Sequence, residues 1–85
     1  MTLTSEGIQE KLQAQMPDAL EIRVAFDGSK AQVLVVLEAF ENMSRIKKQQ
    51  LVYAALSKEI ADGSIHAVMM ETLSPAEWDK VKHFR

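Results

Sequence analysis

Between Ala31 and Met70 the spacing of apolar residues changes twice, and this limits the fold strongly. The run Ala31–Glu38 is rich in valine and leucine, as in a central strand. A longer segment with helical spacing follows, and Ile65–Met70 then alternates like a short strand, apolar on both faces as in the interior of a sheet. Because a strand, crossover helix and strand are almost always right-handed and parallel, we expect the strand at Ile65 to lie parallel to the strand at Ala31.

The helical segment has a recognisable start and end. Ser44 can cap it, and the turn Asp62–Ser64 ends it before the last strand. Its apolar positions fall roughly on one face, and its basic positions project into water. The apolar positions are Ile46, Val52, Tyr53, Leu56 and Ile60, and the basic positions are Arg45, Lys47, Lys48 and Lys58. We therefore expect an amphipathic helix that covers the sheet.

The chain before Ala31 predicts a helix and a strand. Thr4 or Ser5 can cap the helix, in which apolar residues recur every four positions. From Leu20 the period changes to two, which predicts a half-buried strand, and Asp27–Lys30 has the composition of a tight hairpin turn. The recurring helix residues are Ile8, Leu12 and Met16, and the strand residues on one face are Leu20, Ile22, Val24 and Phe26.

The last element begins at the run Ser74–Glu77, SPAE, which combines a serine cap, a proline at the first helical position and a glutamate three residues after the cap. Trp78, Val81 and Phe84 follow at helical spacing and predict an apolar face. The whole order is α-β-β-α-β-α. It predicts an α+β fold in which helices cover a three-stranded mixed sheet, as a single domain over residues 1–85.

Composition narrows the function classes. With no cysteine, the chain offers no disulfide, no thiolate and no all-cysteine metal site. A net charge of −2 gives no overall attraction to nucleic acid. The longest apolar run, Val33–Leu37, is far too short to cross a bilayer, and the first residues lack a signal or transit pattern. We therefore expect a cytoplasmic protein that does not span a membrane.

Four phrases of the sequence, in their order and spacing, resemble the BolA-like family, in particular its short bacterial branch. They are FDGSKAQVLVV, FENMSRIKKQQLVYAAL, SIHAV and SPAEW, and the match covers nearly all of Leu20–Trp78. The resemblance implies a fold like the type II KH domain, in agreement with the element order. It also implies a monothiol glutaredoxin as partner, with a 2Fe–2S cluster shared between the two proteins and glutathione, and a role in cluster trafficking or iron homeostasis. Alone, the chain is expected to be a monomer or a weak dimer.

The resemblance also implies which residues hold the cluster. The family histidine that matches His66 is a recurring cluster ligand, so His66 is the implied metal ligand. The second family ligand is a histidine or cysteine in the loop between the first two strands, where this chain has Lys30. A protonated lysine has no lone pair to offer. Two alternatives stay open: the cluster is held through His66 plus another group, or binding to the glutaredoxin is weaker or cluster-free.

The basic residues Arg45, Lys47 and Lys48 allow a different function, that of a DNA-binding transcriptional regulator which uses this helix edge. A few phosphate contacts without aromatic stacking give weak, salt-sensitive binding. The chain also lacks the Gly-x-x-Gly loop with which KH modules grip a nucleic-acid backbone. The simpler interpretation is the solvated face of an amphipathic helix, with partner or nucleic-acid contact as the alternative.

The remaining candidates are interpreted as structural. His83, near the end of the sequence, is expected to be a solvated side chain, and Trp78, Met69 and Met70 are expected to pack in the core. A catalytic constellation is hard to assemble without cysteine, with two histidines far apart and without a glycine-rich phosphate loop. We expect no enzymatic activity.

Overall fold

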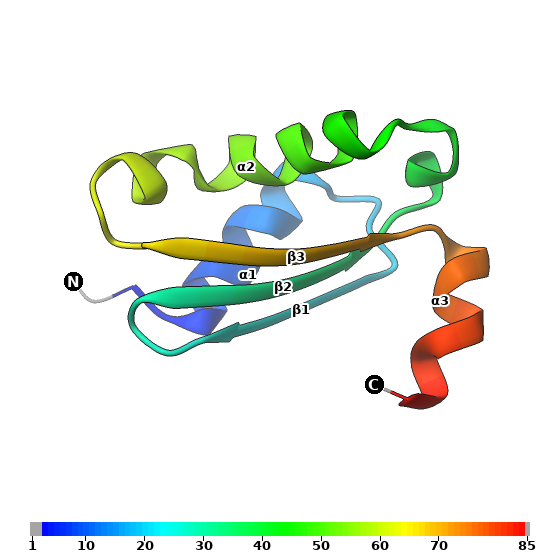
Figure 1. Cartoon of the computed structure of the whole chain (residues 1–85), viewed down its shortest axis with the longest axis horizontal. Helices are drawn as coiled ribbons and strands as arrows, with labels where there is room; N and C mark the ends of the chain where they lie inside the picture. Colours follow the sequence, from blue (N-terminus) through cyan, green and yellow to red (C-terminus); the bar gives the residue numbers. More distant parts are fainter. Residues whose placement is uncertain (1–2, 85) are drawn as a thin grey trace.

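The computed structural model describes residues 3–84 and contains the predicted order of helices and strands (Figure 1). In chain order the elements are α1 (Ser5–Gln15), β1 (Glu21–Phe26), β2 (Lys30–Val36), the 3-10 helix η1 (Glu38–Asn42), α2 (Arg45–Ala61), β3 (Ala67–Leu73), α3 (Pro75–Val81) and the 3-10 helix η2 (Lys82–Phe84). The α+β class and the α-β-β-α-β-α order are therefore confirmed.

The sheet is mixed and has the strand order β1-β2-β3. β1 and β2 pair antiparallel, and β2 and β3 pair parallel, as the crossover rule predicts. α1 and α2 cover one face of this sheet, whereas α3 lies at one end of the other face (Figure 1). The core fills the space between the two long helices and the face that they cover. Its fully buried side chains include Ile8, Leu12, Val35, Phe40, Val52 and Leu56.

Side-chain caps begin all three α-helices. Thr4, Ser44 and Ser74 each accept a hydrogen bond from the backbone N–H three residues further on, as predicted. Ser74 and Glu77 complete a capping box, and the backbone hydrogen bond from Ser74 is the main cause that lowers the pKa of Glu77. Because the folded-state pKa is depressed, this stabilisation is present above the pKa of an unfolded glutamate. It is lost as the pH falls through the folded value.

The packed face of α2 is narrower than predicted. Val52 and Leu56 are fully buried, whereas Ile46, Tyr53 and Ile60 are 66%, 43% and 36% exposed. These three residues follow one another at intervals of seven, roughly 80–120° around the helix from Val52. A helix that lies on a flat sheet buries only one stripe, so the prediction that all five residues share the packed face is wrong. Ile46, Tyr53 and Ile60 form a second, exposed stripe.

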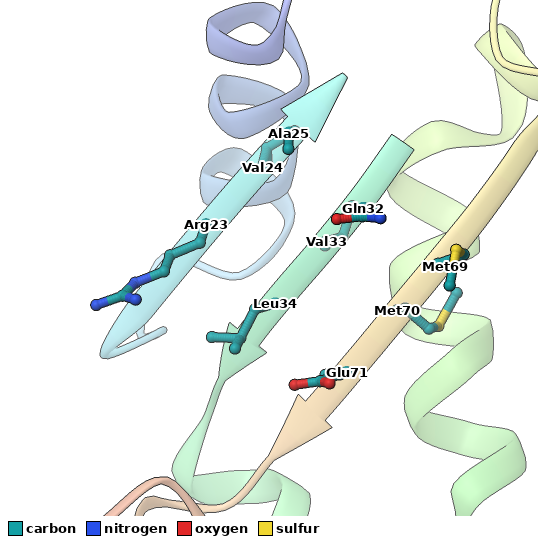
Figure 2. A pocket seen from close by; sticks show the side chains of 9 residues that line it. All are labelled: Arg23, Val24, Ala25, Gln32, Val33, Leu34, Met69, Met70 and Glu71. Atoms are coloured by element: carbon teal, nitrogen blue, oxygen red, sulfur yellow. The ribbon is translucent and has the colours of Figure 1, made fainter. Parts of the chain in front are cut away.

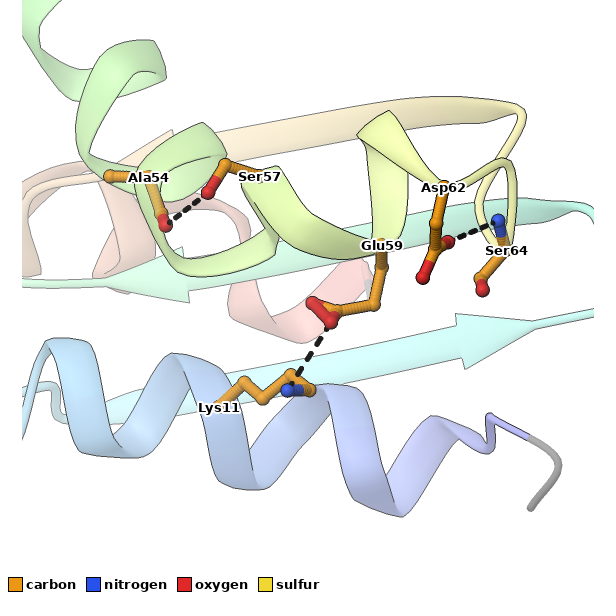
Figure 3. Close-up of polar contacts among 6 residues, drawn as sticks. All are labelled: Lys11, Ala54, Ser57, Glu59, Asp62 and Ser64. Carbon is orange, nitrogen blue, oxygen red and sulfur yellow. Dashed lines mark hydrogen bonds and ion pairs between the residues drawn. The ribbon is translucent and has the colours of Figure 1, made fainter.

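The buried stripe of α2 also contains a carboxylate, on Glu59. Its side chain is 8% exposed, and Oε2 lies 3.3 Å from Nζ of Lys11 on α1 (Figure 3). The other oxygen, Oε1, is buried and has no hydrogen-bond partner among residues 3–84. The Lys11 side chain remains 42% exposed. This ion pair joins α1 to α2, but it also removes a carboxylate from water, which is costly.

β3 is an edge strand, so the prediction that it lies in the interior of the sheet is wrong. β2 takes the central place, as predicted, because it pairs on both sides. Met69 on β3 is 61% exposed, which contradicts its expected place in the core. Met70 and Trp78 are half-buried, and the Arg23 guanidinium lies 5.0 Å from the centre of the Trp78 ring.

The ends of several elements also differ from prediction. Leu20 and Phe84 were expected on packed faces but are 64% and 84% exposed, because β1 begins one residue after Leu20 and Phe84 ends η2, beyond α3. The expected loop after β2 is largely the 3-10 helix η1, which Phe40 anchors in the core. No helix within residues 3–84 is long and apolar enough to cross a membrane.

Candidate functional site

The turn between β1 and β2 forms one side of the candidate site. Asp27 Oδ1 accepts hydrogen bonds from the N–H groups of Lys30 at 2.7 Å and Ser29 at 2.9 Å. These two hydrogen bonds, that of Lys30 first, lower the pKa of the Asp27 carboxyl. Gly28 has a φ of +98°, a conformation that favours glycine. The ionised carboxylate therefore stabilises the turn that presents Ser29 and Lys30.

The turn after α2 forms the other side. Asp62 Oδ1 accepts a hydrogen bond from the Ser64 N–H at 2.8 Å (Figure 3). Ile65 is buried, and its N–H donates to the Glu59 carbonyl at 3.1 Å. These contacts place His66 directly before β3. The prediction that His66 lies within the strand is therefore wrong. The histidine is nevertheless anchored on both sides, by a buried neighbour and by the start of a strand.

His66 contacts Ser29 through both its backbone and its ring. The His66 N–H donates to the Ser29 carbonyl at 2.7 Å, and Nδ1 lies 3.1 Å from Ser29 Oγ. With the proton on Nδ1, the ring donates to the hydroxyl, and Nε2 then presents its lone pair to the solvent that the exposed side chain meets. Metal-bound histidines are usually oriented in this way, by a hydrogen bond from the second ring nitrogen.

Ser29 is the site residue that the sequence reasoning missed. The available signal was the pairing itself: in a parallel arrangement the turn before β2 lies beside the residues that precede β3. The hydroxyl at position 29, and not the side chain at position 30, therefore meets the imidazole. Ser29 orients His66 and is not itself expected to bind metal.

Lys30, which the resemblance places where the family has its loop ligand, points to the face of the sheet that α1 and α2 leave uncovered. Its Cα partner is Ala67, and the next residue, Ala31, is fully buried in the core. Because successive strand residues point to opposite faces, Lys30 points to the face that α1 and α2 leave uncovered. Among residues 3–84, no hydrogen bond or ion pair joins Lys30 to His66.

His66 is not part of a complete set of metal ligands within residues 3–84. In the described part of the chain, no three histidine, aspartate or glutamate side chains are grouped closely enough to hold a metal ion. His83 is exposed on η2, as expected for a solvated side chain. A single exposed imidazole supplies only one ligand, which is fewer than a metal group in a protein needs.

The basic residues lie at the opposite end of α2 from His66. Arg45 and Lys47 are exposed and Lys48 is half-buried, all within the first turns of the helix. Cations at a helix N-terminus oppose the helix dipole, so helix stability does not explain them. The 17 residues of α2 span about 25 Å, and the basic group and the histidine are therefore separate features.

Comparison with known proteins gives consistent matches in sequence and structure. Residues 17–77 match the family described as BolA-like protein. The chain is 48% identical over 71 residues to the acid stress protein IbaG of Escherichia coli (strain K12). This match covers 80% of this chain and 84% of that protein. It also resembles the solved structure of BolA1 from Arabidopsis thaliana, with a TM-score of 0.76 and 27% identity over 91% of this chain and 98% of that one. A bol-like protein from Babesia bovis superposes with a TM-score of 0.81 over 96% of each chain, at 22% identity, which shows a shared fold.

Proposed function

The chain belongs to the BolA-like protein family, and we propose that it is a non-catalytic adaptor that docks on a monothiol glutaredoxin. In this role it helps to hold or pass a 2Fe–2S cluster for which the glutaredoxin and glutathione supply the other ligands. The process served is iron–sulfur cluster trafficking or iron homeostasis. Membership of the family supports the proposed partner and cluster, and His66 of this chain is the proposed point of attachment.

The observation that carries the proposal is the orientation of His66 by Ser29. The His66 imidazole is exposed, and its Nδ1 lies 3.1 Å from the Ser29 hydroxyl. Its other nitrogen, Nε2, is then the one available to a metal group carried by a partner protein. Neutral imidazole is a suitable ligand for iron. The absence of a group of three or more ligating side chains within residues 3–84 fits a cluster that is shared between two proteins.

The chemistry of histidine suits transfer as well as binding. Replacement of cysteine by histidine on one iron raises the reduction potential of a 2Fe–2S cluster. A ring that takes up a proton on the nitrogen facing the metal no longer binds it. A single histidine ligand therefore gives this chain a contact to the cluster that can be released.

Lys30 limits what the rest of the site contributes. An ammonium group cannot donate a lone pair to iron, and the Lys30 side chain points to the face of the sheet that α1 and α2 leave uncovered. We therefore assign one cluster ligand, His66, to this chain. The remaining ligands come from the glutaredoxin and glutathione.

The test is to mix the chain with cluster-loaded monothiol glutaredoxin and to record visible absorption and circular dichroism. The wild-type chain is expected to change both spectra, because a nitrogen ligand joins the cluster. His66→Ala is expected to abolish the change, since a methyl group cannot bind iron. His83→Ala removes the other histidine and is the matched control, for which the full change is expected.

Two outcomes would contradict the proposal. One is a spectral change that His66→Ala retains, because the ligand would then lie elsewhere. The other is no change with the wild-type chain but a change with Lys30→His, which would mean that cluster sharing requires the loop ligand that this chain lacks. Each result is distinct from a folding defect, which far-ultraviolet circular dichroism of each variant detects.

A DNA-binding regulator is the second candidate function, favoured by the cations in the first turns of α2. If it is correct, a Lys47→Ala/Lys48→Ala variant should bind duplex DNA more weakly and with a smaller salt dependence, because fewer counterions are released. Fluorescence anisotropy at several salt concentrations measures this. His66→Ala should leave DNA binding unchanged, and equal binding by the wild type and the double variant would reject the role of these lysines.

A further inference from the structure

The same three-residue turn occurs twice beside His66. Residues 27–29 and 62–64 both have the sequence Asp-Gly-Ser, and the two turns lie at the same end of the sheet (Figure 1). In each turn Oδ1 of the aspartate accepts a hydrogen bond from the serine N–H, and the glycine has a positive φ. Only the first turn reaches the imidazole: Nδ1 lies 3.1 Å from Ser29 Oγ, and among residues 3–84 the ring has no hydrogen bond with Ser64. The two turns therefore differ in what they can do for His66.

Asp27 supplies the hydrogen bonds that hold the first turn. Its Oδ1 accepts the N–H groups of Lys30 at 2.7 Å and Ser29 at 2.9 Å, and its own N–H donates to the Lys30 carbonyl at 3.2 Å. Gly28, at a φ of +98°, has no atom within 4 Å of the place that a Cβ would take. Glycine is also the residue with the greatest backbone freedom. The conformation of the turn therefore depends on the hydrogen bonds of Asp27 more than on packing.

Ser29 is held at both of its backbone groups. Its N–H donates to Asp27 Oδ1, and its carbonyl accepts the His66 N–H at 2.7 Å. With the backbone fixed in this way, rotation about one bond, χ1, decides where the hydroxyl lies. The rotamer present places Oγ 3.1 Å from Nδ1 of His66. Loss of the Asp27 carboxylate removes one of the two backbone contacts and loosens the serine that meets the ring.

We propose that Asp27 is a positioning residue for His66 and that it acts through Ser29. The Ser29 hydroxyl accepts a hydrogen bond from Nδ1–H, which leaves the lone pair on Nε2 already in the free chain, before any metal group arrives. This inference rests on the proposed function, because Nε2 is the nitrogen to which the cluster would bind. It assigns a role to a residue that acts on the ring only through its neighbour.

The charge of Asp27 favours the same tautomer, but as the smaller effect. The hydrogen bonds from Lys30 and Ser29 lower the pKa of the carboxyl, so it is ionised in neutral solution. A negative charge in the turn favours an N–H over a lone pair on the ring nitrogen that meets the turn. Lys30 offsets part of this charge, although its side chain points to the uncovered face, as do those of Gln32 and Leu34, which follow it in phase along β2 (Figure 2). Because Asp27 and Lys30 are both exposed, water screens these charges, and the hydrogen bonds are expected to dominate.

The expected effect can be stated as a ratio of the two neutral tautomers of His66. One hydrogen bond of this kind shifts an equilibrium by about threefold to tenfold. We therefore expect the ratio of Nδ1–H to Nε2–H to fall by about that factor when the Ser29 hydroxyl is lost. A metal group binds only the tautomer with a free lone pair on Nε2, so its apparent dissociation constant rises as the fraction of that tautomer falls.

NMR of the ¹⁵N-labelled free chain measures this ratio from the ring nitrogens, in alkaline solution where imidazoles are neutral. Ser29→Ala is expected to lower the His66 ratio about threefold or more, and Asp27→Ala by a comparable factor. Asp62→Ala makes the same change in the second turn and is the matched control. Its effect is expected to be smaller, because buried Ile65 still anchors that side of the histidine. His83, exposed on η2, is the internal reference in every sample.

A double variant tests whether Asp27 acts through Ser29. When Ser29→Ala is already present, Asp27→Ala should have no further effect on the His66 ratio, because the hydroxyl that it positions is gone. Ser29→Thr keeps a hydroxyl and should retain the wild-type preference. Additive effects of Asp27→Ala and Ser29→Ala would overturn the inference, and so would equal effects of Asp27→Ala and Asp62→Ala. Far-ultraviolet circular dichroism of each variant shows whether the fold is intact.

These measurements need no glutaredoxin, so they separate this inference from the proposed function. If the ratio responds as expected but the wild-type chain leaves the cluster spectra unchanged, the proposed function fails and the role of Asp27 in the free chain stands. If the spectra do change, the concentration of Asp27→Ala needed for half of the change should rise in proportion to the loss of the competent tautomer. A wild-type ratio in Asp27→Ala would overturn the inference whatever the result with glutaredoxin.

Discussion

Replacing Phe40 with alanine is expected to lower the free energy of unfolding by about 3–5 kcal/mol. The Phe40 side chain is fully buried in η1, the short turn between the central strand and α2. Its removal leaves a cavity that the neighbouring elements of the core can fill only in part. Because a domain of this length is stabilised by roughly 4–13 kcal/mol in total, the variant should lose between about a quarter and all of its stability.

Urea unfolding followed by circular dichroism measures this effect. Phe84→Ala is the matched control, since the same side chain is 84% exposed at the end of η2 and its loss should change stability by less than about 0.5 kcal/mol. Thermal unfolding should show the same contrast, with a Tm for Phe40→Ala lower by about 12 °C or more. Similar losses for the two variants would mean that η1 is not anchored in the core as described.

Replacing Lys11 with methionine is expected to destabilise the fold by about 1–3 kcal/mol, because it leaves the buried Glu59 carboxylate without its cation. The loss should be smaller than the roughly 3–5 kcal/mol typical of a fully buried ion pair, because the Lys11 side chain is itself partly exposed to water. Glu59→Met should cost less than Lys11→Met, since the lysine left behind can turn to the solvent. The order of these two losses is the informative result.

The double variant Lys11→Met/Glu59→Met separates the charge from the packing. With both charges replaced by apolar side chains of similar volume, most of the stability should return. Lys82→Met is the matched control, because its ion pair with Asp79, at 3.2 Å, is exposed and should contribute less than about 1 kcal/mol. A double variant as unstable as Lys11→Met would show that the contact between α1 and α2 depends on the ion pair itself.

The features that depend on local interactions could be predicted from the sequence. The caps at Thr4, Ser44 and Ser74 involve partners only three residues away, so residue type and spacing indicate them directly. The parallel pairing of β2 and β3 could be predicted because a long helical connection between two neighbouring strands is the connection that parallel strands need. The family resemblance, confirmed by the comparisons, pointed to the same fold.

The features that depend on tertiary contacts could not be predicted. Val52 and Tyr53 both belong to apolar stripes with helical spacing, and only the position of α2 on the sheet decides which stripe is buried. An apolar strand has the same pattern at the centre and at the edge of a sheet, so the exposure of Met69 was not evident. Glu59 looks like a surface residue of an amphipathic helix, yet it faces Lys11 on α1.

The candidate site was only partly accessible from the sequence. His66 stood out through the family resemblance, since a lone histidine carries little information by itself. Ser29 and the opposite direction of Lys30 depend on how the β1–β2 turn meets the residue before β3, which is a matter of register. The sequence therefore indicated the candidate ligand but not the group that orients it.

The most direct measurement is pulsed electron paramagnetic resonance of the reduced cluster in the complex, with the histidines of this chain alone labelled with ¹⁵N. Direct ligation by His66 predicts a strong ¹⁵N coupling that persists in His83→Ala and disappears in His66→Ala. A cluster-containing complex that shows no ¹⁵N coupling with the wild-type chain, or a coupling that survives His66→Ala, would contradict the assignment of His66 as the ligand.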